Sequence, residues 1–168
     1  MKRLNKTDIE FLRESNAIEG VYDIDSLYQA KEAWKFLKGV KSLTIGDILK
    51  THKILMLNQN LMPDEKGYFR KCKIYVGGRE GVDFISIPER MGVWIDEMNL
   101  DLNECPESFK EEACRVEHIC YELIHPFVDG NGRTGRMFMN WHRIRSGLPI
   151  VVIHEGKEQM DYYKWFKD

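Results

Sequence analysis

Apolar residues recur at helical spacing along most of the chain. The segment 25–38 places Leu27, Ala30, Trp34 and Leu37 on one face, and Gly39 follows as a stop signal. Similar spacing predicts five more helices. One begins near Thr44, one follows Pro88, and the others cover 108–124, 133–145 and about 157–165. The helix from Thr44 carries His52 between leucines, where a satisfied core or boundary histidine is expected.

The starts of two helices carry capping signals. Thr7-Asp8-Ile9-Glu10 and Ser108-Phe109-Lys110-Glu111 both match the capping-box pattern. The first predicts a helix that runs toward Glu19, with Gly20 as its stop. In the second helix, a stripe of apolar residues is expected to face the core: Phe109, Ala113, Val116, Cys120 and Leu123. His142 and Arg143, further along the chain, are expected on a solvated helix face.

One region departs from the helical pattern. Residues 73–76 and 82–86 read as two strands around the glycine-rich turn 77–81, which predicts a β-hairpin. The predicted fold is therefore all-α, in one compact domain, with one short β-hairpin.

Composition and charge narrow the classes of function. A hydrophobic content of 43% supports a packed core and argues against disorder. The net charge of −2 gives no electrostatic footprint for nucleic acid. No apolar run approaches the roughly 20 residues that cross a bilayer, and no apolar segment follows the basic N-terminus as in a secretory signal. A cytoplasmic protein without nucleic-acid or membrane partners is expected.

The four cysteines do not form a strong metal motif. No CxxC pair is present, although Cys114, His118 and Cys120 lie close together in the sequence. Zinc would need a fourth ligand, and Cys120 belongs to the apolar stripe, so packed, reduced thiols are the favoured interpretation.

The segment 125–136 carries the densest chemistry of the chain. His125 is a candidate general base, and Asp129 is a hard oxygen ligand suited to Mg²⁺ or Mn²⁺. Gly130 and Gly132 flank Asn131 and leave backbone N–H groups open to form an anion nest at a helix start. Arg133 and Arg136 share one helical face, and their guanidinium groups match phosphate oxygens. Together these residues predict a site for a nucleoside triphosphate with a divalent cation.

This segment resembles the signature of the Fic family, His-x-Phe-x-(Asp/Glu)-Gly-Asn-Gly-Arg-x-x-Arg. The specified positions all match: His125, Phe127, Asp129, Gly130, Asn131, Gly132, Arg133 and Arg136. The resemblance implies the compact helical Fic fold and transfer of AMP from ATP to a Ser, Thr or Tyr hydroxyl of a target protein.

Roles for individual residues also follow from the resemblance. His125 would be the base, Asp129 would hold the metal, and Gly130, Asn131 and Gly132 would form an anion hole for the α- and β-phosphates. Arg133 and Arg136 would bind the outer phosphates, and Phe127 would anchor the loop in the core. Doc-like relatives, which transfer phosphate, carry Lys where this chain has Gly132, and that difference favours AMP transfer.

In the Fic resemblance the hairpin is a flap over the active site. An extended segment of the target would pair with its free edge through main-chain hydrogen bonds. The residues expected to dock the target are Lys73, Ile74, Tyr75, Val76, Gly77 and Gly78. The neighbouring segment Tyr68–Arg70 is expected to line the base of the flap.

A second motif precedes this core. Ser15, Glu19 and Gly20 match the family's inhibitory pattern (Ser/Thr)-x-x-x-Glu-(Gly/Asn), and Ser15 and Glu19 share one helical face. Its position resembles the class II arrangement, in which Glu19 would pair with Arg136 and hold ATP in an unproductive pose. The chain would then divide into an inhibitory region at 1–22 and a Fic core at 23–168.

Three other functions stay open from the sequence. Glu19 could orient a water molecule for removal of AMP from a modified protein, the chain could transfer phosphate like Doc, or it could sense nucleotide without turnover. Self-modification and formation of a homo-oligomer are also left open.

Overall fold

The computed structural model describes residues 3–167, which fold into a helical bundle with one small hairpin. The helices and strands, in order, are α1 (Lys6–Ile18), α2 (Ile24–Gly39), α3 (Ile45–Leu55), β1 (Tyr75–Val76), β2 (Arg79–Glu80), α4 (Ile87–Glu104), α5 (Lys110–Ile124), α6 (Asn131–Arg145) and α7 (Lys157–Tyr163). Short 3-10 turns lie at Phe84–Ser86, Glu107–Phe109 and Lys164–Phe166. The predicted all-α class with one short hairpin is confirmed.

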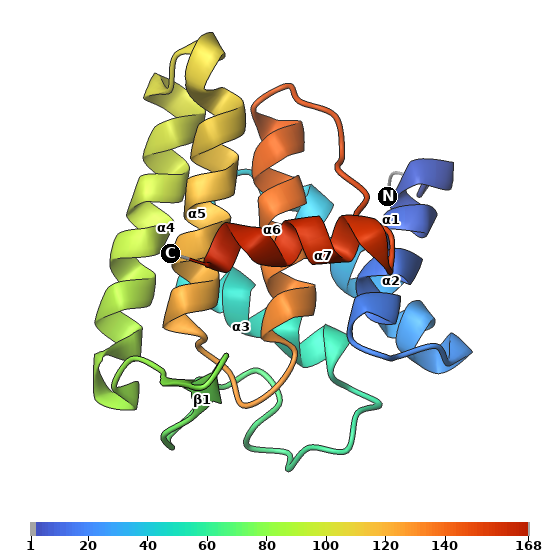
Figure 1. Cartoon of the computed structure of the whole chain (residues 1–168), viewed down its shortest axis with the longest axis vertical. Helices are drawn as coiled ribbons and strands as arrows, with labels where there is room; N and C mark the ends of the chain where they lie inside the picture. Colours follow the sequence, from blue (N-terminus) through green and yellow to red (C-terminus); the bar gives the residue numbers. More distant parts are fainter. Residues whose placement is uncertain (1–2, 168) are drawn as a thin grey trace.

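Helix α6 occupies the centre of the bundle. It contacts α1, α2, α3, α4 and α5, and α7 crosses it on the outside (Figure 1). Because neighbours surround it, α6 buries polar residues as well as apolar ones. His142 and Arg143 are both buried, so the expectation of a solvated face is wrong. Arg143 is satisfied by the Pro149 carbonyl at 2.8 Å and by Glu111 at 2.7 Å.

Two of the predicted helix starts differ in the structure. The cap of α1 is Asn5, whose side chain accepts from the Asp8 N–H while the Asp8 carboxylate accepts from the Asn5 N–H. Thr7 therefore lies inside the helix. At α5 the Glu107–Phe109 turn, which follows Pro106, already curls the chain before the helix begins. No side chain caps α5, so the box predicted at Ser108 is absent.

The buried face of α5 is not the predicted apolar stripe. Phe109, Val116 and Leu123 are exposed, whereas the helix buries Cys114, His118, Tyr121 and Ile124. The buried face includes a histidine, His118, whose Nε2 pairs with the Tyr162 hydroxyl of α7 at 2.8 Å. The buried face therefore lies about one residue further along α5 than apolar spacing indicates. It can include the polar His118 because Tyr162 supplies a hydrogen-bond partner. Leu123 and Cys120 instead line an open groove of about 520 Å³ between α4 and α5.

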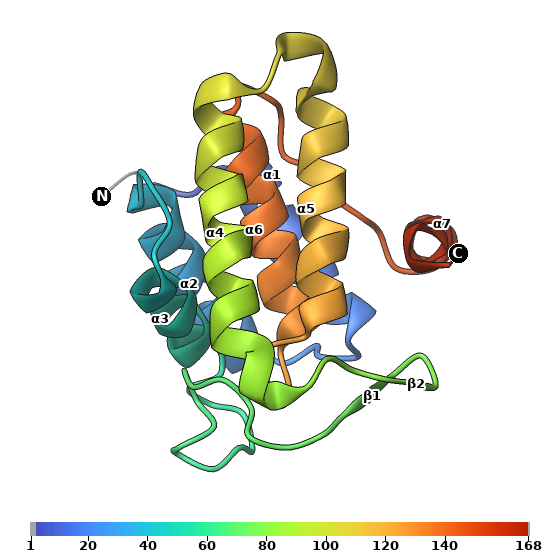
Figure 2. The ribbon, with the colours of Figure 1, turned by 90° about the vertical axis from the view of Figure 1, so that its left-hand side faces the viewer.

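The hairpin is shorter than predicted. Gly77 and Gly78 form a two-residue turn with φ values of +57° and +81°, which is the backbone that tight hairpins favour. Val76 therefore pairs with Arg79, and Tyr75 pairs with Glu80. Asp83 then caps the 3-10 turn at Phe84–Ser86, so residues 82–86 do not form the second strand. In Figure 2 the hairpin lies below the end of α5 and projects sideways, away from α4.

None of the helices within residues 3–167 combines the length and the apolar character that a membrane crossing requires. The four cysteines are free thiols. The predicted division at residue 22 falls between α1 and α2, and the outermost parts of that prediction, residues 1–2 and 168, lie outside the described residues.

Asp8 joins the start of α1 to α2. Its carboxylate accepts from Trp34 Nε1 at 2.7 Å and from Lys38 Nζ at 2.9 Å, in addition to the Asn5 N–H. Burial alone raises the pKa of Asp8, but the bonds from Trp34, Asn5 and Lys38 outweigh it and hold the pKa below its ordinary value.

We predict that Asp8→Ala lowers the free energy of unfolding by about 3 kcal/mol, because it leaves buried donors unpaired. Urea unfolding at neutral pH measures the loss. Since the folded-state pKa is depressed, the difference from wild type should shrink as the pH falls from the ordinary pKa of aspartate toward the lower pKa of the folded state. The exposed Asp64→Ala serves as control and should change stability by less than about 0.5 kcal/mol. Equal losses in the two variants would contradict the role of Asp8.

Candidate functional site

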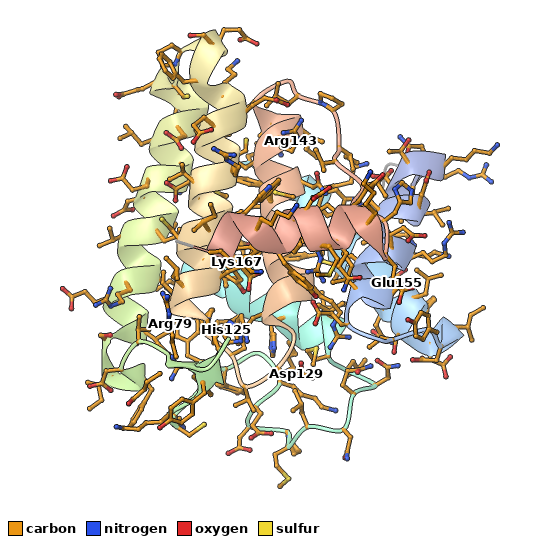
Figure 3. All side chains as sticks on the ribbon, viewed as in Figure 1. Arg79, His125, Asp129, Arg143, Glu155 and Lys167 are labelled. Atoms are coloured by element: carbon orange, nitrogen blue, oxygen red, sulfur yellow. The ribbon has the colours of Figure 1, made fainter. Side chains whose placement is uncertain are left out.

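The loop between α5 and α6 carries the candidate site. His125 ends α5 with φ 50° and ψ 64°, and Gly130 precedes α6 with φ 81°. His125 is the one non-glycine residue with positive φ in the part of the chain that the structure describes. Left-handed backbone at both ends of the loop turns the chain so that α6 starts directly beside the end of α5. Figure 3 shows His125 and Asp129 at the end of the bundle where the hairpin lies.

Asn131 holds this loop together. Its side-chain oxygen accepts from the Phe127 N–H, and its amide nitrogen donates to the Phe127 carbonyl, both at 2.9 Å. The Phe127 ring is buried and stacks on His52, with ring centroids 3.7 Å apart. Phe127 thus anchors the loop as predicted. The Asn131 side chain faces the loop interior, so Asn131 offers only its backbone to an anion.

His52 supports the loop from α3. The Gly67 N–H donates to His52 Nδ1 at 2.9 Å, so the ring proton lies on Nε2, which donates to the Asp129 carbonyl at 2.9 Å. Burial lowers the pKa of His52 to about 4, which keeps the ring neutral. His52 is therefore the satisfied histidine that the sequence predicted, and its bond to the backbone of Asp129 is an unforeseen contribution to the site.

The imidazole of His125 has one free nitrogen. Its Nδ1 lies 3.3 Å from the Glu122 carbonyl and 3.8 Å from the Glu122 carboxylate. Because acceptors face Nδ1, the proton of the neutral ring belongs there, and Nε2 keeps an open lone pair. Burial lowers the pKa of His125. The ring is thus a neutral base at ordinary pH.

Asp129 and the start of α6 form a surface suited to a metal and an anion. The Asp129 side chain is 57% exposed, so its carboxylate is open to a cation. Its Oδ1 accepts from the Gly130 N–H at 2.6 Å. The N-terminus of α6 directs its first N–H groups toward the same place. Of the two glycines that flank Asn131, Gly130 has positive φ, whereas Gly132 lies within the first turn of α6. The expectation that both glycines open the nest is therefore met by the backbone angles of Gly130 alone.

Arg133 is buried with part of its guanidinium unsatisfied. Its NH2 contacts Met56 Sδ at 3.4 Å and lies 3.6 Å from Asp129 Oδ2. Its Nε and NH1 have no hydrogen-bond partner among the described residues. Buried donors of a permanent cation normally have partners. An anion such as a phosphate would complete this group.

Arg136 is satisfied by α1. Its NH2 donates to Glu19 Oε1 at 2.7 Å and to the Ser15 carbonyl at 2.9 Å, and its Nε donates to the Ser15 hydroxyl at 2.9 Å. The pair of Glu19 with Arg136 that the resemblance implies is thus present in the structure. A Cβ at Gly132 would lie 2.3 Å from Glu19 Oε1, so this contact requires glycine there.

Arg70 ties the segment before the flap to the catalytic loop. The guanidinium donates to the carbonyls of His125 at 2.8 Å, Cys72 at 2.8 Å and Val82 at 2.7 Å. Its backbone N–H donates to the Pro126 carbonyl at 2.9 Å. The sequence placed Arg70 only at the flap base. Its acceptors are all main-chain groups, which have no sequence signature.

A model of the Fic/DOC family matches residues 42–142, which is more than half of the chain and includes the whole segment 125–136. The chain belongs to the Fic/DOC family. The family match begins after α1, so it does not cover Ser15, Glu19 and Gly20.

Relatives of known name support this membership. A protein adenylyltransferase Fic of Drosophila erecta is 34% identical over 128 residues, which are 74% of this chain and 24% of that protein. Protein adenylyltransferase fic-1 of Caenorhabditis briggsae is 30% identical over 152 residues, which are 90% of this chain and 28% of that protein. The chain therefore spans about a quarter of the length of these relatives.

Solved Fic structures share the fold. A Fic-domain signaling protein from Bacteroides thetaiotaomicron superposes with a TM-score of 0.79 at 20% identity, covering 95% of this chain and 70% of that one. A fragment of Fic-1 from C. elegans gives 0.70 at 24% identity, covering 96% of this chain and 55% of that one. The match to these Fic structures extends over nearly the whole chain, including most of the region outside the family model.

We predict that Arg70→Lys lowers the free energy of unfolding by about 2–3 kcal/mol, because one ammonium cannot reach the carbonyls that the planar guanidinium joins. Urea unfolding measures the loss, and amide hydrogen exchange should become faster in residues 72–82. Arg115→Lys is the control, since Arg115 only pairs with exposed Glu112, and it should stay within about 0.5 kcal/mol. Unchanged exchange in Arg70→Lys would show that Arg70 does not tether the flap.

Proposed function

We propose that this Fic chain is a protein adenylyltransferase that moves AMP from ATP to a Ser, Thr or Tyr hydroxyl of a target protein. The observation that carries the proposal is the alignment of three groups at one end of α6: a neutral base with a free Nε2, an open carboxylate and a buried arginine with unsatisfied donors. The names of the relatives from Drosophila and Caenorhabditis agree with it.

The reaction would be an in-line displacement. His125 Nε2 takes the proton of the target hydroxyl, whose oxygen forms a bond to the α-phosphorus of ATP. The bond from the α-phosphorus to the bridging oxygen breaks, and pyrophosphate leaves. The backbone N–H groups at the start of α6 and the Arg133 guanidinium would stabilise the negative oxygens.

The residues present fit a divalent metal ion. Asp129 offers an exposed carboxylate beside donors for phosphate, and Mg²⁺ commonly takes one or two protein carboxylates together with phosphate oxygens. Asp129 would therefore hold Mg²⁺ or Mn²⁺ with the phosphates of ATP. When bound, the ion neutralises charge on the phosphate oxygens.

Glu19 would act as a brake on this reaction. Its carboxylate occupies the NH2 of Arg136 and lies over Gly132, where the outer phosphates would otherwise reach the arginine. A charge-assisted hydrogen bond contributes about 2 kcal/mol. This magnitude is enough to change the pose of ATP but too small to exclude ATP from the site.

The target would dock at the hairpin edge. β1 pairs with β2 on one side, and Tyr75 is 71% exposed, which supports main-chain pairing with an extended segment. A cytoplasmic location would supply ATP and reduced thiols. The experiments below also distinguish three alternatives to AMP transfer. These are removal of AMP by a water that Glu19 holds, Doc-like phosphate transfer, and nucleotide sensing without turnover.

We predict that His125→Ala abolishes AMP transfer while ATP binding persists, because the imidazole acts only on the incoming hydroxyl. The assay follows α-labelled ATP into protein of a cell lysate and into the chain itself, and mass spectrometry identifies the adduct. Calorimetry measures ATP binding. Residual transfer within about tenfold of wild type would remove His125 from the role of base, and a phosphate adduct would support Doc-like chemistry.

We predict that transfer requires Mg²⁺ or Mn²⁺ and is lost in Asp129→Ala, because Asp129 has the exposed carboxylate beside the phosphate donors, whereas Glu19 is paired with Arg136 and Glu122 is mostly buried. Titration of Mn²⁺ in the presence of ATP, followed by electron paramagnetic resonance, should show weakened metal binding in the variant. Asp64→Ala, an exposed aspartate, should retain both properties. Full activity in excess EDTA would contradict the metal requirement.

We predict that Glu19→Gly raises AMP transfer by about thirtyfold, since it releases Arg136 for the γ-phosphate. Arg136→Ala should be inactive and should not be rescued by Glu19→Gly, and the four proteins form a double-mutant cycle. Glu14→Gly is the matched control, because it adds a glycine to α1 without touching Arg136 and should leave the rate unchanged. An equal rise in both glycine variants would show that loosening of α1, rather than loss of the Glu19 carboxylate, raises the rate of AMP transfer.

A further inference from the structure

Glu122 lies beside the base, although it belongs to none of the motifs that define the site. It occupies the last turn of α5, three residues before His125, and its side chain is 13% exposed. Its Oε2 is 3.8 Å from His125 Nδ1, on the side of the ring opposite the free Nε2. Its Oε1 is buried and has no hydrogen-bond partner among the described residues.

Helix α6 makes room for this carboxyl group. A Cβ at Gly135 would lie 2.2 Å from Glu122 Oε1, so any side chain at position 135 would displace it. The absence of a side chain at Gly135 thus lets a charged group enter the interface between α5 and α6. Burial of a carboxylate there costs free energy, because its Oε1 has no hydrogen bond to compensate for the loss of water.

Charged and titratable groups from several elements face the pair. Burial raises the pKa of Glu122 to about 7, while Arg136 of α6 lowers it and Glu19 of α1 raises it. Tyr162 of α7 also interacts with Glu122. On the other side, burial and Arg70 lower the pKa of His125, whereas Glu19 and Asp129 raise it. Glu122 therefore changes charge within the range in which the base must work.

We propose that Glu122 is a positioning residue for the base, whose carboxylate stabilises the imidazolium that forms when His125 takes the target's proton. At 3.8 Å the contact is too long for a hydrogen bond, and it becomes an ion pair only when His125 takes a proton. The Glu122 carbonyl therefore fixes the ring, and the carboxylate supplies charge. The proton stays on His125 until it leaves to solvent. The inference rests on the proposed role of His125.

The pair then titrates as a unit. Below neutral pH, Glu122 is protonated and the imidazolium loses its partner. Above neutral pH, the ionised Glu122 carboxylate raises the pKa of His125 and so counteracts the effect of burial, which lowers it. The base strength of His125 would thus rise as Glu122 ionises.

Nuclear magnetic resonance of ¹³C-labelled histidine tests the pairing without any assay of activity. His52, His118 and His142 are buried, with pKa values of about 4, 3 and 4, so their signals stay constant near neutral pH. His125 and His154 remain to be followed, and the spectrum of His125→Ala assigns the former. In wild type, the His125 signal should show a second inflection near the pKa of Glu122, about 7.

Glu122→Gln should remove that inflection, because the amide carries no charge at any pH. The main titration of His125, which falls where Glu122 is already protonated, should change little. Glu122→Asp, which retains a titrating carboxyl group, should keep an inflection. Glu117→Gln is the matched control: Glu117 lies on the same helix, and burial raises its pKa to about 7, but it does not contact His125. Persistence of the inflection in Glu122→Gln would overturn the proposal.

AMP transfer to the chain itself, measured in the Glu19→Gly background, gives the second readout. Glu122→Gln should lower kcat about tenfold with an unchanged KM for ATP, whereas Glu117→Gln should alter neither. Loss of the inflection in Glu122→Gln without loss of kcat would overturn the catalytic role of the pair. Loss of the inflection with no AMP transfer in any variant would support the pairing and identify the proposed function as the part that fails.

Discussion

Arg136 carries a permanent positive charge in the interior of the molecule, where only 2% of the residue is exposed. A guanidinium cannot lose its charge by deprotonation, so the fold must surround it with acceptors. α1 supplies the Ser15 hydroxyl and carbonyl, and Glu19, directly after α1, supplies its carboxylate. The Tyr162 ring of α7 lies 5.8 Å from the guanidinium carbon. One buried cation therefore fixes the first and last helices against the centre of the bundle. An anion that binds the NH2 of Arg136 would compete with Glu19 for it.

The remaining parts of the site depend on main-chain groups that a few side chains hold in place. Asn131 ties the catalytic loop to itself, His52 holds the carbonyl of Asp129, and Arg70 gathers carbonyls from the loop and from the flap base. These polar side chains are buried and come from different elements. With the backbone fixed in this way, His125 Nε2, the Asp129 carboxylate and part of the Arg133 guanidinium keep the capacity to bind a further group.

The sequence was sufficient for the helical fold, the family and the pairing of Glu19 with Arg136, because each rests on local spacing or on a matched motif. It misassigned the buried face of α5, since Phe109, Val116 and Leu123 are more apolar than the buried His118. His118 is stable there because Tyr162, far along the chain, supplies a partner.

Long-range contacts also explain why the sequence does not predict the roles of several other residues. Arg70 binds carbonyl groups, Glu122 fits a space left by Gly135, and Gly132 is required by Glu19 rather than by its own backbone angles. None of these relations has a pattern within one segment of sequence. The sequence predicts a longer hairpin because residues 77–81 fit a wide glycine-rich turn. In the structure, the left-handed backbone of Gly77 and Gly78 closes the turn within two residues.

The loop that joins α5 to α6 satisfies its own hydrogen bonds through Asn131 and rests on the stacked rings of Phe127 and His52. Its shape does not depend on a bound molecule. A nucleotide that enters would find the base, the carboxylate and the helix N-terminus already in register, so little conformational entropy would be lost when it binds. The ordering that would otherwise accompany each round of binding is completed once, when the protein folds.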